Sequence, residues 1–288
     1  MASSHETASL GRKAADDLKA DLSEPDAIGR LDLSGYDALI HCAGVVDEDF
    51  AADPERAFRQ ATLGAAALVD RAVAGGVRRL AYISSAHVYG PLVGAIDEAT
   101  PVNPVSNYAI AHYATEQIFR RAAGQVDAVG LFRPCAVFGT PPDMTGFRRW
   151  GLMPFAFPRR AVIEREIALT GSGDQRRNLV AASDVADVVA AWLPGPGGLT
   201  VLNPLGRLSM SVWEFAQLCG REAEAVTGHP CRVSRREDPG PTPGADFDYR
   251  SRSAMSRGGA DLQAHLRAFM TLIQERARTD DGADQPPA

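Results

Sequence analysis

The chain has 288 residues, and 45% of them are hydrophobic, so its length does not limit the core it can bury. Its formal net charge is −6, and its 30 Lys and Arg residues are scattered, which argues against a general nucleic-acid surface. Residues 1–20 are polar and charged, and no apolar run approaches the roughly 18 residues of a membrane span. We therefore expect no signal peptide, no nucleic acid or membrane partner, and a small-molecule substrate.

The four cysteines lie far apart, without a C-x-x-C pair. Because Cys42 and Cys135 sit inside apolar, strand-like runs, we expect buried thiols in a reducing compartment, and hence a cytoplasmic protein. No set of His, Cys, Asp and Glu residues has the spacing of metal ligands, so no metal is expected.

Strand-like and helix-like segments alternate along the first two thirds of the chain. Residues 12–20 are compatible with a short helix, and residues 21–25 are typical of a strand end followed by a helix start. Apolar runs predict strands at 36–44, 77–84, 128–134 and 199–203, and helical periodicity predicts helices at 54–75, 105–123 and 183–193. This alternation predicts an α/β fold, a doubly wound parallel sheet with right-handed crossovers.

Beyond Gly139 the pattern loosens. Residues 140–165 contain four prolines and scattered aromatic residues, which is typical of a loop-rich substrate lid. Strands are predicted at 167–170 and 178–182, helices at 211–227 and 260–278, and a polar, disordered tail at 279–288. We therefore expect an N-terminal segment at 1–20, a sheet core from 21–139 and 178–203, and a small C-terminal substrate lobe from 140–177 and 204–278.

One stretch holds the residues best suited to chemistry. The second predicted strand ends in two serines, the later being Ser85, and His87 follows at the kind of strand tip where open α/β sheets build their sites. Tyr108 and His112 lie four residues apart on a predicted helix and therefore share one face. Together these side chains would form a cluster able to donate and accept protons near neutral pH.

Five segments resemble, in the right order, the extended short-chain dehydrogenase/reductase family of the NAD-dependent epimerase/dehydratase type. They are residues 40–44, 84–90, 108–116, 132–139, and 171–180 together with 184–186. The resemblance implies a Rossmann-like core, and it implies that Ser85 and Tyr108 are catalytic. It places His87 where dehydratases of the family carry a catalytic acid, and Arg177 where an arginine contacts phosphate. Ala136 stands near the diphosphate, where relatives that bind nucleotide sugars often carry Asn.

Two features depart from this family. The strand, Gly-rich turn and helix that cradle the pyrophosphate of the cofactor are absent, since residues 1–20 hold a single glycine, Gly11. His112 stands where the family's Y-x-x-x-K pattern places a lysine that holds the nicotinamide ribose. We therefore expect an N-terminally truncated member in which residues 1–20 replace the usual first βαβ unit and no cofactor is bound.

Three functions are compatible with these residues. The first is an NAD-independent lyase or isomerase whose acid/base chemistry dehydrates, isomerises or cyclises a carbonyl-bearing molecule, for example a sugar derivative. Ser85 and Tyr108 would hold the substrate oxygen, and His87 or His112, at the ordinary pKa of about 6.5, would move the proton. The second is an NAD- or NADP-dependent nucleotide-sugar epimerase or dehydratase, completed by missing N-terminal sequence or by a partner. The third is a non-catalytic binding subunit.

The strand predicted at 36–44 would lack the neighbour that flanks it in the family, which leaves an open, apolar sheet edge. We expect residues 1–20 to cover this edge, or a second subunit to cover it in a homodimer.

Overall fold

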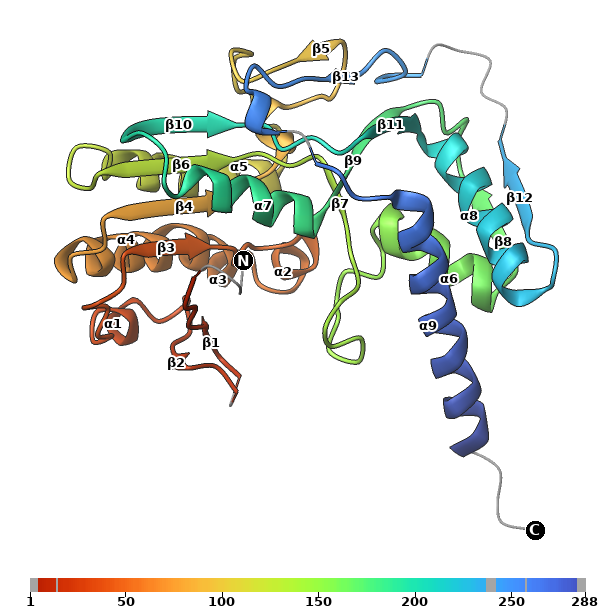
Figure 1. Cartoon of the computed structure of the whole chain (residues 1–288), viewed down its shortest axis with the longest axis horizontal. Coiled ribbons are helices and arrows are strands. Elements are labelled where there is room, and N and C mark those ends of the chain that lie inside the picture. The colour runs from red at the N-terminus through yellow and green to blue at the C-terminus, as the bar shows by residue number, and fades with distance from the viewer. Residues whose placement is uncertain (1–4, 14, 237–241, 257, 284–288) are drawn as a thin grey trace.

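The computed structural model describes residues 5–13, 15–236, 242–256 and 258–283. The main sheet has four parallel strands in the order β10-β6-β4-β3. Their bounds are Gly198–Leu202 for β10, Ala128–Phe132 for β6, Arg79–Ile83 for β4 and Ala38–His41 for β3. The strands lie side by side in Figure 1, and β3 forms one edge of the sheet.

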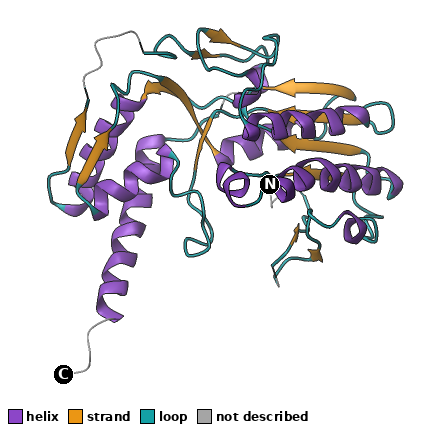
Figure 2. Cartoon of the chain, turned by 180° about the vertical axis from the view of Figure 1, so that it is seen from behind, coloured by secondary structure: helices purple, strands orange, loops and turns teal. Residues whose placement is uncertain are grey.

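Helices cover both faces of this sheet (Figures 1 and 2). They are α4 (Ala65–Ala74) and α5 (Asn107–Arg121) on one face and α7 (Ala182–Trp192) on the other. Leu80 and Tyr82 of β4 pack in the core beneath α4 and α5, whereas Ala81 packs with α7. Successive strand residues point to opposite faces, so one strand serves both cores. The predicted doubly wound parallel sheet is confirmed.

The helix predicted at 54–75 is present, but it contains a π-helical turn. Its parts are α3 (Pro54–Arg59), the π-helical residues Gln60–Gly64, and α4. A Cβ on Gly64 would lie 1.9 Å from the carbonyl oxygen of Leu22, so only glycine lets the helix pass this backbone so closely. The hydroxyl of Thr115 donates to the carbonyl of Ala61 at 2.7 Å, which satisfies an acceptor of the widened turn.

The C-terminal lobe has a core of its own. Its strands are β7 (Ala136–Phe138), β8 (Glu166–Leu169), β9 (Arg176–Ala181), β11 (Leu208–Ser211) and β12 (Arg232–Arg235). They form a sheet in the order β11-β9-β7 and a parallel pair of β8 with β12. The bounds that we expected for the sheet core therefore differ from the structure, since β7 and β9 pair with β11 and not with the main sheet. The helices α6 (Met153–Ile163), α8 (Val212–Thr227) and α9 (Leu262–Ala283) enclose a core around Phe155, Phe215 and Phe269. Residues 279–283, expected in the tail, belong to α9, and 284–288 lie outside the described residues.

The described residues of 12–20, which are 12, 13 and 15–20, form no helix. The strands β1 (Leu10–Gly11) and β2 (Leu18–Lys19) pair there in parallel instead. The carboxylate of Asp17 accepts the backbone N–H of Ser9 at 2.8 Å and its hydroxyl at 3.0 Å. Such side-chain bonds compete with helical backbone bonds, and hydrophobic periodicity does not register them.

Short elements complete the described chain. They are α1 (Pro25–Ile28), α2 (Asp47–Ala52), the 3-10 helices η2 (Ala86–Tyr89) and η3 (Ala254–Ser256), and the parallel pair of β5 (Ala95–Ile96) with β13 (Asp248–Tyr249). In the parts of the chain that the structure describes, no helix combines the length and the apolar character needed to cross a bilayer. Nor do those parts bring three or more His, Cys, Asp or Glu residues together in a way that could hold a metal ion.

The outer edge of β3 has no partner strand among the described residues, because β3 pairs with β4 alone. A hollow of about 930 Å³ runs beside this edge, and residues between 5 and 22 line it together with residues 35–44. Residues of the N-terminal segment line the same hollow but add no strand to the edge, so the covering that we expected stays a prediction. Cys42, just past the end of β3, is exposed, so the expectation of a buried thiol is wrong there.

Candidate active site

The end of β4 is a turn that fixes Ser85 and His87. Ser84 donates its N–H to the carbonyl of Phe132 in β6 at 2.7 Å, so β4 stays paired as far as the turn. Ser85 then caps η2, and its Oγ accepts the N–H of His87 at 3.3 Å. Both side chains therefore belong to one turn at the carboxyl end of the strand, the edge where α/β sheets build their sites.

Helix α5 brings Tyr108 and His112 to the same place. Its N-cap is Ser106, whose Oγ accepts a backbone N–H of the first turn at 3.2 Å. The ring centroids of Tyr108 and His112 lie 4.4 Å apart, and His87 meets Tyr108 edge to face at 5.9 Å. The structure thus brings His87, Tyr108 and His112 into one cluster, with Ser85 held next to His87 by its cap.

A buried ion pair anchors α5. Arg133, which follows β6, donates to the two carboxylate oxygens of Glu116 at 2.8 and 2.6 Å, and the two residues are 3% and 0% exposed. The guanidinium also lies 4.8 Å from the ring centre of Tyr89, and Tyr249 donates its hydroxyl to the carbonyl of Arg133. A bidentate, charge-assisted pair of this kind fixes geometry, so it sets the position of the helix that carries Tyr108.

His112 differs from the proton-transfer group that we expected. Its Nδ1 lies 2.6 Å from the hydroxyl oxygen of Tyr82. Burial, together with the positive charge of Arg149, lowers the pKa of His112 to about 3. Such an imidazole is neutral at pH 7, so the expectation of an ordinary pKa is wrong for His112.

His87 is open to solvent, although neighbouring chain crowds it. This crowding and the positive charge of Arg177 lower the pKa of His87, while the carboxylate of Asp47 opposes them. Because its ring reaches water, His87 can exchange a proton with solvent as well as with a ligand next to Tyr108.

Two arginines act on the cluster from the lobe side of the chain. Arg149, in the loop before α6, places its guanidinium carbon 6.0 Å from the ring centre of Tyr108. Its Nε is buried and has no hydrogen-bond partner in the part of the chain that the structure describes. Arg177, in β9, acts on His87 through its charge, and its Nη1 donates to the carbonyl of Arg176 at 2.6 Å. Sequence reasoning missed Arg149, because it lies in a Pro-rich loop without a motif.

Neither Arg149 nor Arg177 forms an ion pair within the described ranges, whereas their chain neighbours do. Arg148 pairs with Asp49, and Arg176 lies 3.7 Å from a carboxylate oxygen of Glu214. A guanidinium that lies next to proton-exchanging groups and has no carboxylate partner can bind an anionic ligand.

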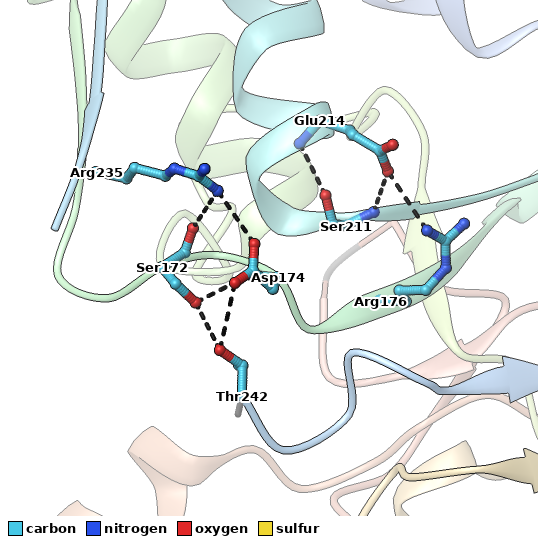
Figure 3. Close-up of polar contacts among 7 residues, drawn as sticks. All are labelled: Ser172, Asp174, Arg176, Ser211, Glu214, Arg235 and Thr242. Atoms are coloured by element: carbon cyan, nitrogen blue, oxygen red, sulfur yellow. Dashed lines mark hydrogen bonds and ion pairs between the residues drawn. The ribbon is translucent and has the colours of Figure 1, made fainter. Parts of the chain in front are cut away.

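Figure 3 shows the contacts that hold the loop before β9. The residues drawn are Ser172, Asp174, Arg176, Ser211, Glu214, Arg235 and Thr242. Arg235 donates to the carbonyl of Ser172 and to the carboxylate of Asp174, both at 3.1 Å. These polar side chains bond to one another, so the loop serves to position β9 and its Arg177.

Ala136 is the other residue that we assigned to the substrate. It opens β7, is half-buried, and pairs through its backbone with Leu179 of β9. Its side chain packs against the core of the lobe, on the strand next to the one that carries Arg177. Its role in binding stays a prediction.

The described residues fit one end of a dinucleotide. β3 leads into a turn of small residues, Ala43 and Gly44, and a Cβ on Gly44 would lie 3.2 Å from Cε1 of His112. This turn and the Tyr108 helix fit the nicotinamide ribose end. The pyrophosphate needs a Gly-rich turn directly before a helix. The N-cap residues of the described helices α1 and α2 are Glu24 and Val46, and neither helix follows a Gly-rich turn. No described residues fit the pyrophosphate.

A family model described as "NAD dependent epimerase/dehydratase family" matches residues 2–197. The chain belongs to this family. A relative, the uncharacterized protein y4nG of Sinorhizobium fredii, is 29% identical over 179 residues, which are 60% of this chain and 42% of the relative. The chain thus spans less than half of the length of that relative.

Several solved structures share the fold. RMD from Pseudomonas aeruginosa, complexed with NADPH, matches with a TM-score of 0.72 and 21% identity over 95% of this chain and 93% of that one. A UDP-glucose 4-epimerase from Thermotoga maritima, with UDP-glucose, matches with a TM-score of 0.73 and 18% identity over 94% and 90%. MoeE5 in complex with UDP-glucose and NAD matches with a TM-score of 0.69 and 22% identity over 93% of this chain and 90% of that one. These likenesses confirm the Rossmann-like fold.

The expectation that the chain uses no cofactor is wrong. Its family is NAD-dependent, and proteins of the same fold are known in complex with NAD or NADPH. The inference failed because it treated an absent Gly-rich turn and His112 as decisive, whereas the family match extends over residues 2–197 despite both. The NAD-independent function depended on that inference and therefore loses its support.

Proposed function

We propose that this chain provides the substrate-binding and proton-transfer part of an NAD- or NADP-dependent nucleotide-sugar epimerase or dehydratase. One observation carries the proposal: Arg149 and Arg177, without carboxylate partners in the described residues, flank the cluster around Tyr108. Guanidinium groups placed in this way suit a substrate with phosphate oxygens near the carbon that reacts. Relatives of the same fold hold UDP-glucose, which supports this substrate class.

The residues of the cluster divide the proton transfers between them. Tyr108 moves the proton of a sugar hydroxyl, and Ser85 donates a hydrogen bond to the same oxygen. His87, which reaches solvent, supplies the second proton when the reaction expels water, a step that a dehydratase needs and an epimerase does not. Arg177 holds the diphosphate on the β9 side, with Ala136 next to it. The dinucleotide, when bound, supplies an acceptor and donor of hydride.

The pyrophosphate of the cofactor requires a further unit, and we propose that this unit adds to the open edge of β3. The edge has no partner strand among the described residues, and the hollow of about 930 Å³ runs along it. Preceding sequence or a different partner chain would supply the strand and the Gly-rich turn.

Calorimetric titration with UDP-glucose tests the substrate half of the proposal. We expect binding by the chain, and an affinity about tenfold lower in Arg177→Gln, because a charge-assisted hydrogen bond to phosphate is lost. Arg207→Gln, at an exposed position, is the matched control. Absence of binding, or equal affinities of the two variants, would contradict the proposal.

The source of the missing unit is tested separately. An in-frame Gly-rich turn encoded upstream, or a partner protein that carries such a turn and binds the chain, supports the addition at β3. If the DNA shows no such turn and the protein binds no such partner in its own cell extract, this part of the proposal fails.

A further inference from the structure

Tyr82 is a buried tyrosine that the proposed chemistry leaves unused. It lies in β4, is 1% exposed, and stacks with rings from both neighbouring elements. The centroid distances are 5.4 Å to His41 of β3, 5.8 Å to His112 and 5.3 Å to Phe119 of α5. Phenylalanine would fill this stack equally well, so the hydroxyl of Tyr82 requires a reason of its own.

The hydroxyl has one acceptor among the described residues, Nδ1 of His112, at 2.6 Å. Burial raises the pKa of Tyr82, so the phenol keeps its proton. The nearby hydroxyl of Thr115 donates to backbone carbonyls, including one of its own helix at 3.0 Å. The proton in the short contact therefore belongs to Tyr82, and Nδ1 of His112 accepts it.

His112 stays neutral in this environment. Burial is the main cause of its lowered pKa. The positive charge of Arg149 acts in the same direction, as do those of His41 and His87 when they are protonated. None of the described groups that act on it is a carboxylate. A neutral imidazole carries one proton, and since Nδ1 accepts, that proton resides on Nε2.

The edge of the His112 ring that carries Cε1 and Nε2 faces Gly44. A Cβ on Gly44 would lie 3.4 Å from Nε2 and 3.2 Å from Cε1, so any side chain there would crowd the ring. A cavity of about 10 Å³ is lined by both Gly44 and His112, together with other residues of the turn after β3 and of α5. It is polar and has room for a single small group such as a water or a hydroxyl.

We propose that Tyr82 is a positioning residue that holds His112 as a neutral Nε2–H donor, aimed at a ligand oxygen next to Gly44. The resemblance places at position 112 a lysine, which combines a hydrogen bond with a positive charge. Here the hydrogen bond remains and the charge is lost. The identity of the ligand, a hydroxyl of the nicotinamide ribose, rests on the proposed function, whereas the tautomer of His112 does not.

Nitrogen NMR of the ¹⁵N-histidine-labelled chain tests the tautomer directly. The signals of His112 are assigned by their loss in His112→Asn. We expect a protonated Nε2 and a bare, hydrogen-bonded Nδ1 in the wild type, and a mixture of tautomers in Tyr82→Phe, which keeps the ring but removes the donor. A proton on Nδ1 of the wild type, or unchanged signals in a folded Tyr82→Phe, would overturn the proposal. If Tyr82→Phe does not fold, the wild-type spectrum alone decides.

Nicotinamide mononucleotide at millimolar concentration tests the ligand, because it carries the ribose and needs no pyrophosphate cradle. We expect it to shift the Nε2–H resonance of His112 in the wild type. In Gly44→Ala the tautomer should remain while the shift falls at least about tenfold at equal concentration, since the new methyl group fills the space. An unshifted wild-type resonance would overturn the assignment of this ligand. Failure of the proposed function would instead appear as absent UDP-glucose binding with the His112 tautomer intact.

Discussion

The corner where β4 meets α5 and the edge formed by β3 lie in one sheet, but they are built differently. In the corner, polar groups are buried in pairs, Arg133 with Glu116 and Tyr82 with His112. Along β3 the described residues border a hollow, and the backbone edge has no partner strand. The polar groups of the β4–α5 corner are thus paired with one another, whereas the β3 edge leaves space for a further segment and a ligand.

The largest effect is expected where the corner loses its ion pair. Arg133→Met leaves the carboxylate of Glu116 buried without a partner, which should lower the free energy of unfolding by roughly 3–5 kcal/mol in urea denaturation. Combining Arg133→Met with Glu116→Leu should restore most of that loss. The exposed pair of Arg78 with Asp127 is the control, and Arg78→Gln should cost below about 1 kcal/mol. If Arg133→Met and Arg78→Gln lowered the free energy of unfolding equally, the buried pair would be no more important than the exposed one.

Acid should also weaken the corner. Burial lowers the pKa of His41 to about 4, and burial with nearby positive charge lowers that of His112 to about 3, whereas an unfolded histidine titrates near about 6.5. Both folded-state values are depressed, so folding favours the neutral form. This stability is fully present above about pH 6.5 and is lost as the pH falls towards the folded values, by roughly 2 kcal/mol per histidine between pH 6.5 and 5.

Urea denaturation at pH 7.5 and pH 5 measures this loss. His112→Asn keeps an acceptor for Tyr82 but cannot bind a proton, so it should lose less stability on acidification than the wild type. His229→Asn, at an exposed position, should behave as the wild type does. An unchanged acid response in His112→Asn would show that the imidazole is not protonated on unfolding.

A smaller effect is expected at the mouth of the site. Arg149→Gln removes a guanidinium next to Tyr108 that has no carboxylate partner among the described residues, so the affinity for UDP-glucose should fall about tenfold, or about 1.4 kcal/mol. Arg148→Gln is the matched control, because Arg148 is exposed and already paired with Asp49. Calorimetry that finds equal affinities in the two variants would remove Arg149 from the substrate site.

Hydrophobic periodicity predicted the main strands and helices of the sheet, because one face of each long element is buried against another. It failed at residues 12–20, where Asp17 bonds to the backbone of Ser9 and no helix forms. The π-helical turn Gln60–Gly64 was also missed, since the close approach of Gly64 to the backbone of Leu22, more than forty residues away, is not visible in the sequence.

The candidate site was partly predictable for a related reason. Ser85, His87 and Tyr108 belong to short motifs whose spacing is visible in the sequence. Arg149 and Tyr82 belong to none, and they reach the cluster only through tertiary packing. Tertiary packing also explains why the expected pKa of His112 was wrong, since that pKa depends on burial and on charges from other elements.

The smallest effect is expected in local hydrogen exchange along the sheet. β4 has a partner on each side, whereas β3 pairs with β4 alone in the described chain. Amides of β3 that point away from β4 should therefore exchange roughly tenfold or more faster than those of β4, as mass spectrometry of peptides over residues 36–44 and 78–84 would measure. Because a unit docked on β3 would donate or accept these bonds, its binding should slow exchange in the first peptide and leave the second unchanged. Equal protection of the two strands in the isolated chain would mean that the edge is already covered, and the contrast between corner and edge would fail.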